Sequence, residues 1–184
     1  MTSTTAGVLL LVGSGVFFVG AAFGVPLVFI ESRPDERLRM LEERLLAWRL
    51  AQPFYALGPL IAAAGVGVLA GASTGSSRVA LAIACAALGV GALSWSWSTY
   101  LRGRHHREFA AGTLPGWPFA VYVWLTLVGL SALGVGLLLA DLPAWMGWLT
   151  LGADVVFAVG YIRFKDIPPF VFYLLLVPVG LVLL

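Results

Sequence analysis

Residues 117–140, WPFAVYVWLTLVGLSALGVGLLLA, contain no Asp, Glu, Lys or Arg. A helix needs roughly 20 mainly apolar residues to cross the hydrocarbon core of a bilayer, where each backbone polar group must be satisfied within the segment. This stretch therefore predicts a transmembrane helix. The pattern recurs along the chain, and we expect six spans at about residues 6–30, 53–72, 79–101, 117–140, 145–162 and 167–184.

The composition also indicates a membrane environment. Hydrophobic residues make up 60% of the 184 residues and charged residues 11%, whereas about a quarter of residues in soluble domains are charged. The length suits one domain, so residues 1–184 are expected to form an all-α membrane protein, a compact bundle of six transmembrane helices. The net charge of +2 is too small to indicate a nucleic-acid partner, and membrane lipid is expected instead.

The basic residues fall almost entirely on one side of the predicted bundle. Of the 11 Lys and Arg residues, all except Arg78 lie in the first, third and fifth loops: Arg33, Arg37, Arg39, Arg44, Arg49, Arg102, Arg104, Arg107, Arg163 and Lys165. Short loops rich in Lys and Arg stay in the cytoplasm. We therefore expect these loops inside and both termini outside.

The first loop has the pattern of an amphipathic helix. Ser32 and Asp35, with Pro34 between them, are typical of a helix start. Apolar residues then recur on one face at helical spacing: Leu38, Leu41, Leu45 and Trp48. We expect an interfacial helix over residues 34–52 on the inner membrane surface, with Pro53 separating it from the second span. Either a structural role or partner docking fits this helix.

Small residues four positions apart allow helix backbones to approach closely in lipid. Two such pairs occur, Gly20 with Gly24 and Gly67 with Gly71. They predict close packing within the bundle and, equally, a seam for a homo-oligomer or another membrane protein.

Asp154 is the only charged residue deep inside a predicted span. A central Asp costs about 2.5 to 3.5 kcal/mol on the insertion scale, so its helix needs neighbours that shield the carboxyl group. Its own helix face carries a partly polar stripe: Gly147, Thr150, Ala158 and Tyr161. Ser94 and Ser98 form a second polar stripe in the third span, where we expect hydrogen-bond partners for Asp154.

Two roles are open for Asp154. Ionisable residues inside membranes are functional by default, which predicts a substrate or ion site made of Asp154, Ser94, Ser98, Tyr161 and Thr150. The alternative is a neutral Asp that hydrogen-bonds a neighbouring helix and serves packing specificity alone.

No pattern indicates catalytic, cofactor-binding or metal-ligating residues. His105 and His106 are adjacent, point about 100° apart on a helix and lie among Arg residues that repel a metal ion. Cys85 is the single cysteine, so it forms no CxxC site and no intrachain disulfide. The sequence also lacks a Walker loop and a dinucleotide fingerprint.

Four stretches resemble a group of uncharacterised six-span membrane proteins of high-GC, actinobacterial-type bacteria. They are FVGAA at 18–22, the loop 36–52 that ends in WRLAQ, LPAWMGW at 142–148, and PPFVFY at 168–173. The resemblance implies a six-helix layout and a location in the bacterial plasma membrane.

Short loops and an interior with few ionisable groups favour a non-enzymatic scaffold or accessory subunit. A small transporter or channel that uses Asp154 is the first alternative, and its polar cavity would reach that residue. A lipid-modifying intramembrane enzyme is the second, although catalysis usually needs an acid–base pair and only one intramembrane carboxyl group is available.

Overall fold

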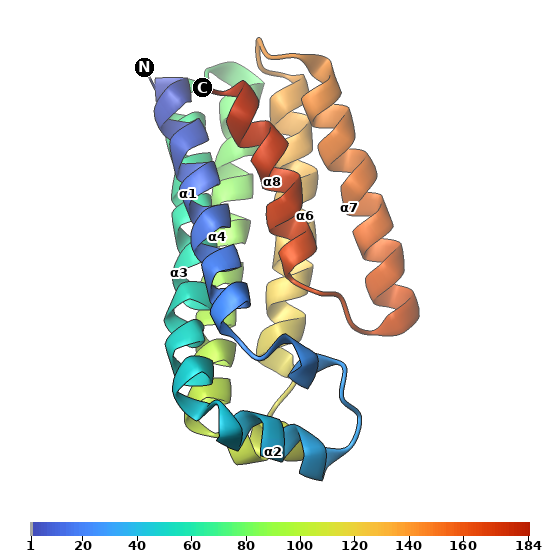
Figure 1. Cartoon of the computed structure of the whole chain (residues 1–184). Coiled ribbons are helices and arrows are strands. Elements are labelled where there is room, and N and C mark those ends of the chain that lie inside the picture. The colour runs from blue at the N-terminus through green and yellow to red at the C-terminus, as the bar shows by residue number, and fades with distance from the viewer. Residues whose placement is uncertain (1) are drawn as a thin grey trace.

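The computed structural model describes residues 2–184, and helices form all of the regular structure in that range. In chain order the elements are α1 (Thr2–Phe23), the 3-10 helix η1 (Pro26–Phe29), α2 (Pro34–Glu43), α3 (Leu45–Ala72), α4 (Gly75–Arg104), α5 (His106–Ala111), α6 (Trp117–Leu138), α7 (Ala144–Phe164) and α8 (Phe170–Val182). The long helices run side by side, and both chain ends lie at one end of the bundle (Figure 1).

Five of these helices are long and apolar enough to cross a membrane, namely α1, α3, α4, α6 and α7. The sixth predicted span corresponds to α8, which is apolar but only 13 residues long. At 1.5 Å per residue α8 covers about 20 Å. The protein is thus a helical membrane-type bundle with five full-length apolar helices and one short one.

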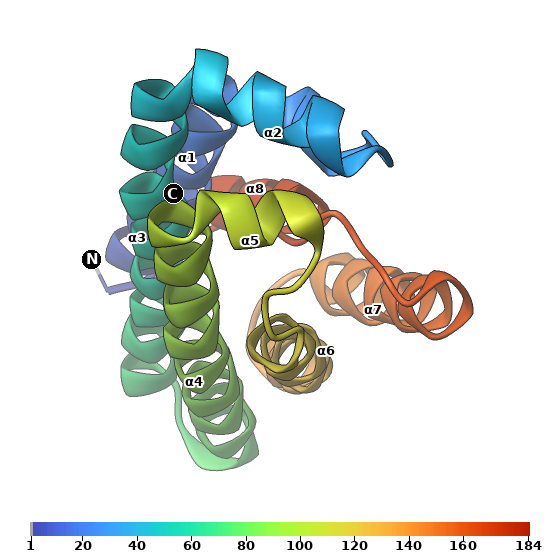
Figure 2. The same cartoon turned by 90° about the horizontal axis from the view of Figure 1, so that it is seen from below.

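Each long helix packs mainly on one or two neighbours. The main contacts follow the order α8, α1, α3, α4, α6 and α7, and α8 also contacts α6 and α7 through Tyr173 and Phe172. Seen from below, α2 and α5 lie across the end of the bundle opposite the chain ends (Figure 2). This end carries most of the arginines, and we call it the arginine-rich end.

A separate hydrophobic cluster holds α2 and α5 onto the arginine-rich end. Its buried members are Val25, Val28, Leu41, Trp48 and Ala110. The rings of Trp48 and Phe109 stack with centroids 5.2 Å apart. Arg37 adds hydrogen bonds to the carbonyl oxygens of Glu31 and Ala110. We refer to η1, α2 and α5 together as the cap.

The first loop differs from the prediction in where its helices break. The helix that starts at Pro34 ends at Glu43, and residues 45–52 belong to α3, which continues through Pro53. The interfacial helix therefore does not extend to residue 52. The chain turns at Arg44, and Leu41 and Trp48, on either side of this break, pack in the same hydrophobic cluster.

Two other helix ends also differ from the prediction. The helix-capping residue before α2 is Arg33 rather than Ser32, with no side-chain cap, and its backbone N–H donates instead to the Glu31 carboxylate at 2.9 Å. The first long helix ends at Phe23 rather than near residue 30. Pro26 then starts η1, since proline has no N–H to continue the ladder of α1.

Three of the four glycines predicted to mediate packing contact helices of the same chain. A Cβ atom on Gly20 would lie 3.0 Å from that of Phe54, one on Gly24 would lie 3.0 Å from the Tyr55 hydroxyl, and one on Gly67 would lie 3.0 Å from the Cys85 sulfur. Only Gly71 of the four faces open space. Close packing within the bundle is confirmed for these three positions.

Candidate functional site: a cavity at the arginine-rich end

Asp154 lies halfway along α7 and is 6% exposed. The predicted stripe on its helix face does point inward, because Gly147, Thr150 and Tyr161 are buried as well. The hydroxyl of Ser131 on α6 donates a hydrogen bond to Oδ2 of Asp154. Within residues 2–184, Oδ1 has no hydrogen-bond partner.

The other predicted polar residues do not converge on Asp154. Ser94 on α4 donates to the carbonyl oxygen of Pro118 at 2.8 Å, and Thr150 donates to that of Met146 at 2.8 Å. Tyr161 packs edge-on against Trp124, and Ser98 is buried on α4. The partner expected from the third span is replaced by Ser131, because α6 is the helix that packs on α7.

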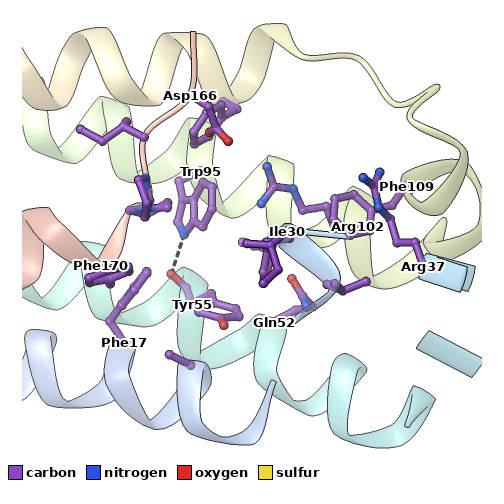
Figure 3. Close-up of a pocket in the computed structure, with 18 residues that line it drawn as sticks. Phe17, Ile30, Arg37, Gln52, Tyr55, Trp95, Arg102, Phe109, Asp166 and Phe170 are labelled. Carbon is purple, nitrogen blue, oxygen red and sulfur yellow. Dashed lines mark hydrogen bonds between the residues drawn. The ribbon is translucent and has the colours of Figure 1, made fainter. Parts of the chain in front are cut away.

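A cavity of about 460 Å³ lies elsewhere, between the bundle and the cap. None of the five predicted site residues lines it. Its walls come from seven α-helices, η1 and residues 166–169, and most of the lining side chains are aromatic or aliphatic (Figure 3). The few polar side chains among them are Arg37, Gln52, Tyr55, Thr99, Arg102 and Asp166.

The late start of α8 helps to leave this space. Pro168 and Pro169 precede α8, and the chain from Asp166 to Pro169 forms one wall of the cavity in place of helix. Proline lacks the backbone N–H that a helix interior needs, so Pro168 and Pro169 suit the segment before a helix and its very start.

A second proline positions Trp95 in the wall. Pro59 lies inside α3 and cannot donate to the carbonyl oxygen of Tyr55, four residues earlier. The indole N–H of Trp95 on α4 donates to that oxygen at 2.9 Å, as the dashed line in Figure 3 marks. A side chain thus satisfies the freed carbonyl group, as membrane interiors require.

Arg102 is the central charge of the cavity. Its guanidinium carbon lies 4.9 Å from the ring centroid of Trp95, and three further rings are within 6.0 Å: Phe29, Phe109 and Phe119. In Figure 3 the guanidinium points into the space between Trp95, Asp166 and Ile30. Cation–π contacts of this kind contribute about 0.5 to 2 kcal/mol each.

The charge of Arg102 has no carboxylate partner within 4 Å in the described part of the chain. Arg37, the other arginine of the cavity, is already engaged by the backbone carbonyl groups of the cap. Asp166 lines the same cavity but is exposed to the outside and makes no ion pair with Arg102. Within residues 2–184, the cavity therefore presents two arginines without an ion-pair partner, of which only Arg37 is hydrogen-bonded, and one carboxylate that attracts Arg102 from beyond ion-pair distance.

In the sequence, Arg102 counts only among the basic loop residues that predict the orientation of the chain in the membrane. A signal was nevertheless present, because Trp95, Thr99 and Arg102 are spaced 4 and 3 residues apart and so share one helix face. Trp95 and Thr99 on that face are buried, which carries Arg102 toward the interior.

The cavity has the composition of a binding pocket. Its lining holds no His, Cys or Ser, and its one carboxylate, Asp166, has no second acid or base beside it. Large apolar walls with a few convergent polar groups are typical of ligand pockets. Comparisons with protein-family models, curated proteins and solved structures find no match for this chain.

Proposed function

We propose that this chain is a non-enzymatic integral membrane protein, an accessory subunit or scaffold, that binds an amphipathic molecule in the cavity at its arginine-rich end. One observation carries the proposal: an arginine without a carboxylate partner stands in a cavity of about 460 Å³ whose walls are mostly apolar. A molecule with an apolar body and an anionic group would match both features.

The chain crosses a bacterial plasma membrane six times in this proposal, with both termini outside. Support comes from the outward faces of the helices, which are apolar along their length, as in Val79, Ile83, Val90, Leu93, Val155, Val156, Val159 and Ile162. The basic residues gather at the arginine-rich end, which the positive-inside rule assigns to the cytoplasm. Helix α8 and residues 166–169 together make the sixth crossing.

The cap would then lie at the inner membrane surface, with α2 as the interfacial helix. Helix α2 buries Leu41 beneath it and exposes the charged residues Asp35, Arg39 and Glu43. A helix with one apolar and one charged face is typical of the interface. The cavity would sit just beneath this surface, at the depth of lipid headgroups and the first chain carbons.

The orientation is tested by labelling single cysteines on intact cells in a Cys85→Ala background. Thr74→Cys marks the loop between α3 and α4, and Thr113→Cys marks the loop between α5 and α6; both positions are exposed. A membrane-impermeant maleimide should label Thr74→Cys only. Labelling of Thr113→Cys in intact cells would contradict the proposed orientation.

Ligand binding is tested by filling the cavity. Ala21 on α1 lines it, while the adjacent Ala22 is exposed. Ala21→Phe should weaken the retention of added phospholipid by about tenfold in native mass spectrometry, equivalent to about 1.4 kcal/mol. Ala22→Phe is the matched control and should behave as wild type. Equal lipid retention by both variants would refute the cavity as the binding site.

One observation favours a second candidate function, a transporter or channel that uses Asp154. The Oδ1 atom of Asp154 is buried and unpaired, and such an atom could accept a proton or cation. An Asp154→Asn variant that folds normally should then lose transport in a proteoliposome flux assay. Full retention of flux by this variant would exclude the role.

A further inference from the structure

The cavity at the arginine-rich end carries two opposite charges that attract each other without forming a direct ion pair. Arg102 and Asp166 both line it, yet no nitrogen of Arg102 lies within 4 Å of the Asp166 carboxylate. Figure 3 shows the two side chains on neighbouring walls of the same space. A ligand that bears one anionic and one cationic group could engage both.

We propose that the occupant is a zwitterionic phospholipid of the phosphatidylethanolamine type, taken from the cytoplasmic leaflet. This inference rests on the proposed function and specifies the ligand of the same site. The lipid phosphate contacts Arg102, the ammonium group contacts Asp166, and the acyl chains leave along the apolar wall.

Arginine is suited to the phosphate because its planar guanidinium donates two parallel hydrogen bonds to phosphate oxygens. The rings of Trp95 and Phe109 hold the guanidinium of Arg102 from their faces. A ligand could therefore use the free N–H groups at the edge of the guanidinium plane. Thr99 is buried on the same face of α4 and lines the cavity, but its hydroxyl already donates to the Ser96 carbonyl oxygen at 2.9 Å, so Arg102 is the donor left for the phosphate.

Asp166 distinguishes the zwitterion from a purely anionic lipid. A phosphate alone would gain from Arg102 and lose from the like charge of Asp166, whereas a primary ammonium donates hydrogen bonds to the carboxylate. A quaternary ammonium has no N–H to donate, so a choline headgroup gains less. Charge complementarity of this kind sets specificity more than affinity.

The apolar wall provides a path for the acyl chains. Phe17, Ala21 and Phe170 line the cavity from α1 and α8, and Phe170 and Ile30 are also exposed on the outer surface, at 44% and 79%. The cavity thus reaches the side of the bundle, where lipid surrounds a membrane protein. A lipid could enter from the bilayer without passing through water.

The test measures retention of phosphatidylethanolamine and phosphatidylglycerol with identical chains by native mass spectrometry of the full chain. Wild type should prefer phosphatidylethanolamine by roughly tenfold. Arg102→Gln should weaken both lipids by roughly tenfold, while Arg104→Gln, whose guanidinium pairs with the exposed Tyr100, should change neither. Arg102→Lys keeps the charge and should recover part of the loss, which separates charge from folding.

Asp166→Asn should have a different effect from Arg102→Gln. It should strengthen phosphatidylglycerol binding and so abolish the preference for phosphatidylethanolamine. Equal binding of both lipids by wild type, with no effect of Asp166→Asn, would overturn the headgroup inference. The proposed function would survive that result, provided that Ala21→Phe still blocks binding. If inorganic phosphate at millimolar concentration displaced the bound lipid, a free anion site would replace the lipid site. If neither lipid bound, both proposals would fail.

Discussion

Gly13 on α1 and Gly58 on α3 bring two helix backbones into direct contact. A Cβ atom on Gly13 would lie 2.7 Å from the carbonyl oxygen of Gly58, and one on Gly58 would lie 2.8 Å from that of Gly13. Such reciprocal contact is available only to glycine, and it gives helices in lipid their closest approach. The helix pair α1–α3 supports one wall of the cavity.

Gly13→Ala should therefore destabilise the bundle, since the added methyl group meets backbone atoms that cannot move aside. Gly15→Ala on the same helix is the matched control, because nothing lies within 4 Å of its Cβ position. Its better helix propensity should leave stability unchanged or raise it by up to about 1 kcal/mol. Thermal unfolding in detergent measures the stability of both variants. Equal unfolding temperatures for Gly13→Ala and Gly15→Ala would show that the Gly13–Gly58 contact does not limit how closely the helices approach.

Trp95 and Pro59 should be energetically coupled through the carbonyl oxygen of Tyr55. Trp95→Phe removes the indole donor and leaves that buried acceptor unpaired, at a cost of about 1 to 3 kcal/mol. Pro59→Ala restores a backbone N–H that can reach the same oxygen, so Trp95→Phe should cost less in that background. A double-mutant cycle on unfolding free energies measures the coupling. Additive effects would contradict it.

Ser131→Ala should destabilise the packing of α7 on α6, because it leaves both oxygens of the buried Asp154 carboxyl group without a partner. We expect a loss of about 1 to 3 kcal/mol in unfolding free energy. Ser96→Ala is the control, since its hydroxyl only donates back to the Ala92 carbonyl within α4. A loss no larger for Ser131→Ala than for Ser96→Ala would refute a packing role for the Ser131 hydrogen bond.

The cap should loosen as the pH falls because of His106. Burial, together with Arg49 and Arg107, lowers the pKa of His106 below its usual value of 6.5, although Glu42 opposes this. The unfolded chain therefore takes up a proton first. The stabilising contribution is complete above about pH 6.5 and is lost progressively below it.

Hydrogen exchange of α2 and α5 between about pH 8 and pH 5 would detect the loosening, because protection reports local stability. His106→Gln should flatten this pH dependence. His105→Gln, a change at the neighbouring imidazole that pairs with Glu108, should retain it. An unchanged pH profile in His106→Gln would exclude His106 as its source.

The long helices could be predicted because crossing a bilayer imposes a length and an absence of charge. The span predicted at 117–140 corresponds to α6 at Trp117–Leu138, and that at 145–162 to α7 at Ala144–Phe164. The break at Arg44 could not be predicted, because residues 34–52 favour helix throughout. Their apolar spacing continues across the break, and Leu41 and Trp48 pack in one cluster on either side of it.

The two candidate sites also differ in how far the sequence predicts them. Asp154 stands out in the sequence because it is an acid within an apolar stretch, but its partner Ser131 depends on which helices are neighbours. The cavity at the arginine-rich end draws its walls from segments as distant as Phe17 and Phe170. No local pattern brings these residues together, so only the fold reveals the site.

The pairing of α8 with α1 has a consequence for biogenesis. The hydroxyl of Ser14 reaches the carbonyl oxygen of Tyr173 at 3.3 Å, across 159 positions of the chain. During synthesis α1 leaves the ribosome before α8, so its buried face, which includes Gly7 and Ser14, waits for a partner made much later. A short helix such as α8 is a weak insertion signal by itself. Nascent chains stalled before α8 should therefore be the form that an insertase or a membrane protease recognises.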